Sequence, residues 1–468
     1  MYITGANYEG CFNDKRLEKR GKSLLSSLFR GSTGVIQQLS QTRAEQKGYY
    51  RFLNNDRVKE GDLVSEITTR CGRHVEGKLV LCIQDSSEVN LVQHSRKLDP
   101  DSGVGLLDAD HISKGIGFKF HPTLVIDALN YFPIGWSDIQ LWNRPMERNG
   151  LSRPAMQRMP IENKESYKWL RSVQNSQAVL KQASGRIMVQ DREADIYEFL
   201  AQDLDANTYL LVRSRCDRNL QEDGMLWKFI ENQPAAGSYT MQVNGDDRSQ
   251  QPAREAIMEV RYGRTEIRKP GNVRSAKQSV PVSIIEVREI NSIASEPLKW
   301  RLITTLGVDS FMDACQMIEW YSCRWAIEEV FRALKKEKFK IESSEMQQGW
   351  AIRKLTVMML DTIIKLFQMQ YAYSIEEGAD LDATMCFTTP QINCLEAVTH
   401  KMEGKTEKQK NPFKTGTLAR ACWTLARLGG WKGYQSQRPP GITTWCVGLE
   451  KFYNIFEGYN LQIDVGTP

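Results

Sequence analysis

Short apolar runs alternate with longer helical patterns through the middle of the chain. Residues 78–85 (KLVLCIQD) form an apolar run that is too short for a helix and ends on an acid, and residues 186–191 (RIMVQD) repeat this pattern. Helical patterns lie between such runs, for example at residues 164–183. The other strand candidates are residues 117–127, 134–144, 208–215 and 299–306. This alternation predicts an α/β fold in which helices are layered on a sheet.

Three regions depart from this alternation. Residues 1–75 contain short helical patterns and no strand pattern. Residues 216–298 show β-type alternation with Gly and Pro between the runs, which predicts an all-β insert. Residues 345–373 predict a long core helix, and residues 374–468 predict further helices with aromatic-rich segments. We therefore expect a helical N-terminal domain, an α/β domain over residues 76–373 that carries the insert, and a helical C-terminal region.

The segment from Trp320 to Lys336 (WYSCRWAIEEVFRALKK) predicts one helix with two distinct faces. An apolar stripe consists of Ile327, Val330, Phe331 and Leu334. At about 100° per residue, five other residues lie within roughly 60° of one another: Tyr321, Arg324, Glu328, Arg332 and Lys335. A carboxylate among these groups suits a phosphate backbone next to a metal ion. The alternative is a solvated face on which Glu328 pairs with Arg332.

Two strand candidates end in acids, at Asp85 and Asp191, and Glu328 adds a third acid from the later helix. We expect these three carboxylates at one edge of the sheet. Magnesium prefers hard oxygen ligands, so a carboxylate cluster without His or Cys suits one or two such ions. Two ions could activate an attacking oxygen and stabilise a leaving oxygen during phosphoryl transfer.

Structural interpretations of the same acids remain open. Asp85 could cap a turn, and Asp191 could cap the helix that follows it. Glu193 and Asp195 compete with Asp191 as the ligand, and Glu329 competes with Glu328. Helical angle favours Glu328, because its neighbour is rotated by about 100°.

Composition narrows the class of protein. The chain has 468 residues, enough for several domains, and no apolar run reaches the ~18 residues of a membrane span. Its first residues lack the apolar core of a signal peptide, so we expect a cytoplasmic protein with no membrane partner. The 10 Cys are not spaced as CxxC and the 5 His are scattered, which argues against a zinc site. Cys82, Cys315 and Cys323 are expected to be reduced and buried.

The charge distribution is uneven although the net charge is only +5. Residues 1–80 contain 14 Lys and Arg against 9 Asp and Glu, and residues 401–440 contain 9 against 2. Basic ends around a net acidic middle favour nucleic-acid contacts outside a carboxylate site. A solvated surface with random unevenness is the alternative.

The residues around the acids resemble those of the DDE transposases of the insertion-sequence-four family. The resemblance rests on the tract VQDREADIYEFL around Asp191 and on the pattern Tyr-x2-Arg-x3-Glu-x6-Lys from Tyr321 to Lys335. Further matches are QDSSEV at Asp85, YYRFLNN at Arg51, LLVRSR at Arg213, LKWRLITT at Trp300 and LARLGGWKG near the C-terminus. They occur in one order from about residue 10 to about residue 450.

This resemblance implies an RNase H-like mixed sheet flanked by helices, with the β-rich insert between the second Asp and the Glu. It also implies a helical DNA-binding domain over residues 1–75 and a helical dimerisation region over residues 374–468. The implied reaction is cut-and-paste transposition, which comprises end nicking, hairpin formation, hairpin opening and strand transfer. The implied partners are double-stranded DNA, as transposon inverted-repeat ends and target, and a second copy of the chain. Such a protein would associate with the bacterial nucleoid when bound to DNA.

Site roles follow from the same resemblance. Asp85, Asp191 and Glu328 would be catalytic and would hold two Mg²⁺ ions, with Mn²⁺ as a substitute. Phosphates near the cut would be held by Tyr321, Arg324 and Lys335. Trp300 would stack on a flipped base, its alternative being a sheet-packing aromatic. The remaining expected DNA contacts are Arg213, Arg215, Arg51, Arg16 and Arg20.

Two further readings of the chain stay open. One is a stand-alone RNase H-like nuclease or junction resolvase, and the other is a non-catalytic DNA-binding protein descended from a transposase. The tract QDSSEVNL also departs from the family pattern, because Glu88 follows Asp85 closely. Glu88 could perturb metal binding or point to solvent.

Overall fold

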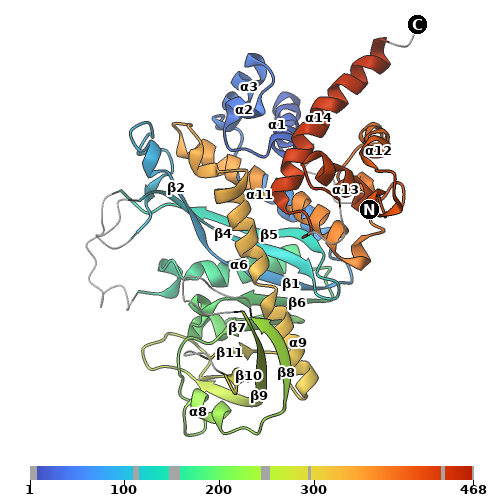
Figure 1. Cartoon of the computed structure of the whole chain (residues 1–468). Helices are drawn as coiled ribbons and strands as arrows, with labels where there is room; N and C mark the ends of the chain where they lie inside the picture. The colour runs from blue at the N-terminus through green and yellow to red at the C-terminus, as the bar shows by residue number, and fades with distance from the viewer. Residues whose placement is uncertain are drawn as a thin grey trace. The chain divides into compact units, whose positions relative to one another are not determined.

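A computed structural model describes residues 8–108, 115–146, 159–243, 253–292, 297–433 and 438–465 (Figure 1). Contacts between residues divide the chain into two compact units. The first unit comprises Met1–Glu76, Ser86–Asn149 and Ile327–Pro468, and the second comprises Gly77–Asp85 and Gly150–Ala326.

The second unit is built on a mixed sheet. In spatial order its strands are β1 (Leu79–Gln84), β6 (Gly185–Gln190), β7 (Thr208–Arg213), β11 (Lys299–Thr304), β10 (Ser279–Ile290), β9 (Arg254–Arg268) and β8 (Gly237–Val243). The first three strands pair in parallel, and every later pairing is antiparallel. β1 and β6 are buried along almost their whole length, as continuous apolar runs predict for parallel strands covered on both faces.

Helices cover this sheet. α6 (Tyr167–Val179) packs against β1, and α9 (Phe311–Ser322) packs against β6 and β7. α7 (Tyr197–Leu200) is a single turn. The predicted fold class, a mixed α/β sheet flanked by helices, is therefore confirmed. The predicted β insert forms β8, β9 and β10, and it also contains a short helix that the sequence pattern did not indicate, α8 (Leu226–Glu231).

The first unit combines helices with a small antiparallel sheet. Its strands are β2 (Ser87–Asn90), β3 (Gly105–Leu106), β4 (Ile116–Asp127) and β5 (Pro133–Trp142), and β4 pairs with each of the others. Its N-terminal helices are α1 (Lys15–Gly31), α2 (Ile36–Leu39), α3 (Arg43–Leu53) and α4 (Glu60–Gly72). Later helices are α11 (Gly349–Ser374), α12 (Thr389–Met402), α13 (Leu418–Leu428) and α14 (Ile442–Val465).

The core of the first unit centres on α11. This 26-residue helix is buried on nearly all sides, and it packs against β5, α4 and α13 (Figure 1). The sequence predicted a core helix here, because the segment is apolar over much of its surface. The three-domain division expected from the sequence stays a prediction.

The single helix predicted from Trp320 to Lys336 is wrong. α9 ends at Ser322, α10 spans Trp325–Arg332, and a π-helical turn follows at Ala333–Glu337. At the junction the backbone N–H of Arg324 donates to the carbonyl of Tyr321, a three-residue step that tightens the chain out of α-helical geometry. Residues on opposite sides of the junction therefore do not follow the regular spacing that placed Tyr321 and Lys335 on one stripe.

The predicted burial of cysteines is only partly correct. The structure gives all ten cysteines as free thiols, and Cys82 is buried in β1 as expected. Cys315 and Cys323, on α9 and in the junction after it, are half-buried.

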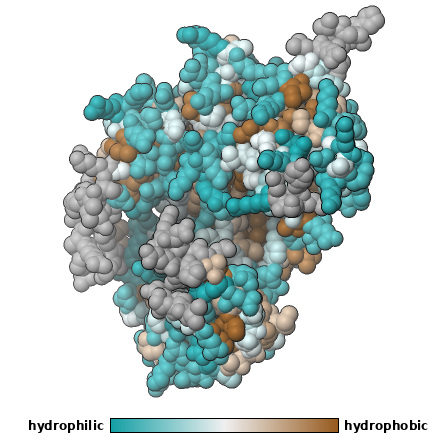
Figure 2. All heavy atoms as spheres, in the orientation of Figure 1, coloured by the Kyte–Doolittle hydropathy of each residue, from teal (hydrophilic) through white to brown (hydrophobic). Residues whose placement is uncertain are grey.

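The molecular surface is mainly hydrophilic on the face seen in Figure 2. Across the described ranges, no helix is both long enough and apolar enough to span a membrane. The long helix α11 carries charged residues along its length, such as Arg353, Lys354 and Asp361.

These buried charges on α11 tie it to the N-terminal helices. Arg70 of α4 donates to Asp361 over 2.6 Å, and the Asp361 side chain is only 3% exposed. Arg353 pairs with Glu60 at the start of α4 over 2.7 Å. The Lys354 ammonium donates to the carbonyls of Leu53, the last residue of α3, and Asn55, each over 3.0 Å. The N-terminal helices are therefore fixed to the core by charge-assisted hydrogen bonds as well as by apolar packing.

Breaking the buried Arg70–Asp361 pair should destabilise the protein strongly. Asp361→Ala leaves the Arg70 guanidinium without its shortest partner, which typically costs about 3–5 kcal/mol for a buried pair. Urea unfolding of the full chain measures this loss. Asp380→Ala is the control, because Asp380 and Lys414 form a pair that is 74% and 78% exposed and should contribute less than about 1 kcal/mol. Equal effects of the two variants would contradict the expectation.

Candidate functional site

Asp85 and Asp191 follow neighbouring parallel strands directly. β1 and β6 pair in register, with Gln84 opposite Gln190, so the next residue on each strand is one of the two acids. Neighbouring strands lie about 4.8 Å apart. The structure thus brings the first two predicted acids to the same edge of the sheet, and both are half-buried.

Each acid is contacted by one residue of the Tyr-x2-Arg motif. The Tyr321 hydroxyl, in the last turn of α9, lies 3.4 Å from Asp191 Oδ1. The Arg324 guanidinium, in the junction after α9, lies 3.3 Å from Asp85 Oδ2 and is 9% exposed. Two residues that are three positions apart in the sequence therefore contact two acids on adjacent strands.

The environment of Tyr321 keeps its hydroxyl protonated. Burial, followed by the negative charge of Asp191, raises the pKa of Tyr321 to about 12. The positive charges of Arg324 and Arg213 oppose this shift, which places both guanidinium groups in the electrostatic neighbourhood of the tyrosine. Tyr321 is consequently a hydrogen-bond donor to Asp191 at neutral pH.

Two acids that competed with Asp191 are engaged elsewhere. The Asp195 side chain is fully buried and accepts from Arg218 over 2.5 Å and from the backbone N–H of Arg215 over 2.6 Å. Glu193 is largely exposed and lies 3.8 Å from Lys168. This geometry favours Asp191 as the acid that is available at the strand end.

Glu328 and Lys335 belong to the first unit. Glu328 is half-buried on α10, and its neighbour Glu329 forms an ion pair with Arg332. The proposed pairing of Arg332 with Glu328 is therefore replaced by contacts of Arg332 with Glu329 and, over 3.1 Å, with Glu337. Lys335 lies in the π-helical turn, 3.6 Å from Glu342.

The metal site stays a prediction. In the part of the chain that the structure describes, no three or more His, Cys, Asp or Glu side chains lie close enough to hold an ion. The donor set at the strand edge nevertheless fits a hard cation in part, because Asp85 and Asp191 supply carboxylate oxygens side by side. Arg324 supplies the compensating positive charge at Asp85 in this arrangement.

The other predicted DNA contacts of the second unit lie on or after sheet strands. Trp300 is half-buried on β11 and faces Val287 of β10. Its neighbours Lys299 and Arg301 both bind Glu286, so alternation along the strand places Trp300 on the opposite face. Arg213 ends β7, and Arg215 is exposed just beyond it.

The predicted N-terminal contacts do not form one cluster of interacting side chains. Arg16 is 92% exposed and pairs with Asp14, the N-cap of α1. Arg20 lies over the Tyr49 ring, 6.0 Å from its centroid. Arg51 is exposed in the last turn of α3.

Sequence reasoning missed two features of the site. Trp325 is 63% exposed, and its ring lies 5.5 Å from the Arg324 guanidinium. Gln84 and Gln190, which precede the two acids, are completely buried. Each strand ends in Gln and is followed by Asp, and this repeated Gln-Asp dipeptide was the signal available in the sequence.

Comparison with known proteins links the N-terminal helices to transposases. Residues 9–58, which include α1, α2 and α3, match a family model described as transposase DNA-binding. Among solved structures, the chain is similar to a piggyBac transposase in a synaptic complex with hairpin DNA determined by cryo-EM. The identity is 9%, the similarity covers 95% of this chain and 76% of that chain, and the TM-score is 0.38. So weak a structural likeness bears on neither fold nor function, and the link rests on the N-terminal match.

The raised pKa of Tyr321 predicts a pH-dependent contribution to stability. The unfolded chain releases this proton near pH ~10, whereas the folded protein keeps it until about pH 12. The contribution is therefore complete below about pH 10 and is lost as the pH rises through about 12. Tyr321→Phe should lose less unfolding free energy than the wild type between about pH 9 and about pH 11, measured by urea unfolding. Identical losses in both proteins would contradict the assignment.

Proposed function

We propose that this chain is a DNA transposase of the insertion-sequence-four type that cuts and joins phosphodiesters at an Asp-Asp-Glu site in an RNase H-like core. The observation that carries the proposal is the placement of Asp85 and Asp191 on neighbouring parallel strands, each contacted by a residue of the Tyr-x2-Arg motif. The transposase DNA-binding match of residues 9–58 supports the choice of substrate.

In the proposed function, the N-terminal helices bind DNA. Arg16 and Arg51 lie within the matched residues and are exposed at the protein surface, where Arg16 would exchange Asp14 for a phosphate oxygen. Contacts of this kind orient DNA without reading its sequence. The pairing of two copies of the chain at the transposon ends is part of the same proposal and rests on the sequence resemblance.

Asp85, Asp191 and Glu328 would hold two Mg²⁺ ions. When bound, such ions activate the attacking oxygen and stabilise the leaving oxygen of an in-line displacement. Carboxylates at the end of a buried, paired strand suit this role, because the sheet holds their backbones rigidly.

Tyr321 and Arg324 would exchange their acid partners for phosphate oxygens when DNA binds. Arg324 presents a planar fork that matches two phosphate oxygens, and Tyr321 presents a hydroxyl donor that stays protonated at neutral pH. Lys335 would add a point charge. In this scheme Arg324 offsets the charge of Asp85 in the free protein, and the Tyr321 hydroxyl donates a hydrogen bond to Asp191. Both groups would contact the phosphodiester in the complex.

Removing either strand-end acid should abolish cleavage. Asp85→Asn and Asp191→Asn each delete a carboxylate ligand while keeping the side-chain shape, and we expect cleavage to fall by more than about 100-fold. The assay incubates the full-length protein and Mg²⁺ with DNA carrying the inverted repeats that flank its gene, and it detects hairpins and double-strand breaks on gels.

Glu88→Gln is the matched control for these variants. Glu88 lies three residues after Asp85, but it is opposite Lys119 on β4 and 4.0 Å from its ammonium. The Glu88→Gln variant should therefore cleave DNA at close to the wild-type rate. Cleavage that survives in both aspartate variants would rule out the proposed site.

The third acid can be tested with two adjacent glutamates of α10. Glu328→Gln should reduce cleavage by more than about 100-fold, because it removes the proposed ligand. Glu329→Gln should change cleavage little, because Glu329 pairs with the exposed Arg332 at the surface. The two substituted residues are neighbours on the same helix. Equal losses of cleavage, or a larger loss in Glu329→Gln, would contradict the assignment of Glu328 as the third acid.

A stand-alone nuclease would share the acids but not the complete reaction. Strand transfer into a target plasmid separates the two functions, because only a transposase joins the 3′ end of the cut DNA to new DNA. Cutting without plasmid integration would favour the nuclease. Metal-independent binding without any cutting would favour a non-catalytic DNA-binding protein.

A further inference from the structure

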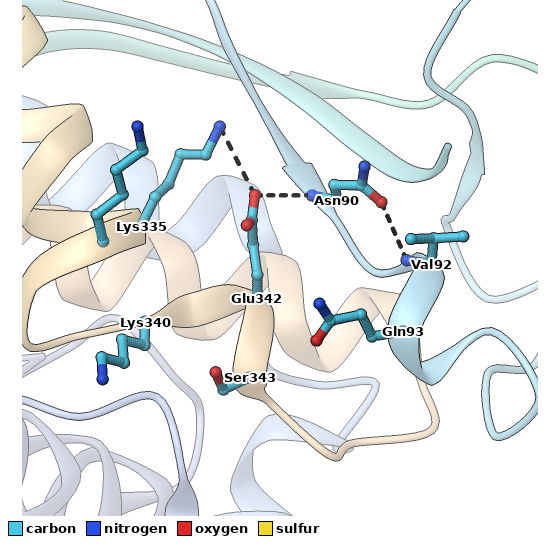
Figure 3. A pocket seen from close by; sticks show the side chains of 8 residues that line it. Asn90, Val92, Gln93, Lys335, Lys340, Glu342 and Ser343 are labelled. Carbon is cyan, nitrogen blue, oxygen red and sulfur yellow. Dashed lines mark hydrogen bonds and ion pairs between the residues drawn. The ribbon is translucent and has the colours of Figure 1, made fainter. Parts of the chain in front are cut away.

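A basic hollow lies around Lys335 in the first unit (Figure 3). Its volume is about 330 Å³, which is large enough for a phosphate group with part of its sugar. The lining residues come from the end of β2, the segment after it and the turns after α10, and they are Asn90, Val92, Gln93, Lys335, Lys336, Lys340, Glu342 and Ser343.

The charges of this hollow are unbalanced. Three lysines line it, at positions 335, 336 and 340, and Glu342 is the carboxylate among the lining residues. Gln93 and Ser343 add uncharged groups that can donate hydrogen bonds. A concave surface with excess ammonium groups and neutral donors attracts an anion with several acceptor oxygens.

Glu342 is fixed at the centre of this charge pattern. Its Oε1 accepts from the backbone N–H of Asn90 over 3.1 Å and lies 3.6 Å from the Lys335 ammonium (Figure 3). The short 3₁₀ turn Ile341–Ser343 carries it, immediately after Lys340 in a left-handed conformation with φ of 43°. One carboxylate oxygen thus receives both a backbone donor and an ammonium, which are the kinds of donor that bind a phosphate oxygen.

We propose that this hollow is a binding subsite for a DNA phosphodiester and that Glu342 is its resident counterion, which competes with the phosphate for Lys335. The inference rests on the proposed function and adds Lys336, Lys340 and Glu342 to it. Glu342 lowers the positive charge of the subsite in the free protein. It therefore limits the affinity for DNA in general, and a phosphate must displace it from Lys335 to bind.

Charge-conserving and charge-removing variants of Glu342 test this role. Glu342→Gln keeps an oxygen that can accept from Asn90 but removes the negative charge. Its affinity for DNA should rise by roughly fivefold at low salt, which corresponds to two unit charges about 4 Å apart in water. The plot of log affinity against log salt should also become steeper by up to about 0.9. Glu342→Asp keeps the charge and should show no gain.

The measurement is fluorescence anisotropy of the full-length protein with a short labelled duplex of unrelated sequence, in EDTA and at several salt concentrations. Glu337→Gln is the matched control, because Glu337 lies close in sequence and pairs with Arg332; it should bind like the wild type. The double variant Lys336→Ala/Lys340→Ala should bind more weakly, with a slope flatter by up to about 0.9 per lysine. Circular dichroism confirms that each variant is folded.

The outcomes separate this inference from the proposed function. A wild type that binds DNA while Glu342→Gln binds equally or more weakly overturns the counterion role alone. An unchanged affinity in the double lysine variant overturns the subsite. Because the assay contains no divalent metal, loss of DNA cleavage does not affect it, whereas a wild type that neither binds nor cuts DNA overturns the proposed function itself.

Discussion

The parallel pairing of β1 with β6 is the constraint on which the candidate site depends. Gln84 lies opposite Gln190, so Asp85 and Asp191 leave the sheet at the same edge. Both strands are buried along almost their whole length, so a slip of one residue would disrupt close-packed contacts on both faces of the sheet. The two acids are therefore brought together by the packing of residues that take no part in chemistry.

Acids held this close repel each other unless nearby groups offset their charge. Arg324, in the junction after α9, offsets the charge of Asp85, and the Tyr321 hydroxyl in the last turn of α9 donates a hydrogen bond to Asp191. The hollow around Lys335 shows the same balance with the signs exchanged, since several lysines surround the anchored carboxylate of Glu342. In the free protein Arg324 contacts Asp85, which would bind a cation in the proposed reaction, and Glu342 contacts Lys335, which would bind a phosphate. Ligand binding at either place would therefore replace one of these contacts.

Local sequence patterns predicted the elements better than the junctions between them. The apolar runs at β1 and β6, the long helix α11 and the β-rich insert all follow from periodicity. The interruption between α9 and α10 does not, because residues 320–336 keep a helical pattern throughout. Arg324 lies at this interruption, bound to an acid 239 residues away in the chain, and no local propensity reports such a contact.

The sequence by itself determined which acids end the two strands and which motif accompanies them, because strand ends and residue spacing are local properties. Only the tertiary structure decided how those groups are used. In the folded protein Asp195 pairs with Arg218 and Glu193 lies near Lys168, whereas Asp191 accepts a hydrogen bond from Tyr321. The physical reason is that ion pairs and hydrogen bonds form between residues that packing brings together, such as Asp191 and Tyr321, which are 130 positions apart. Periodicity along the chain carries no information about that distance in space.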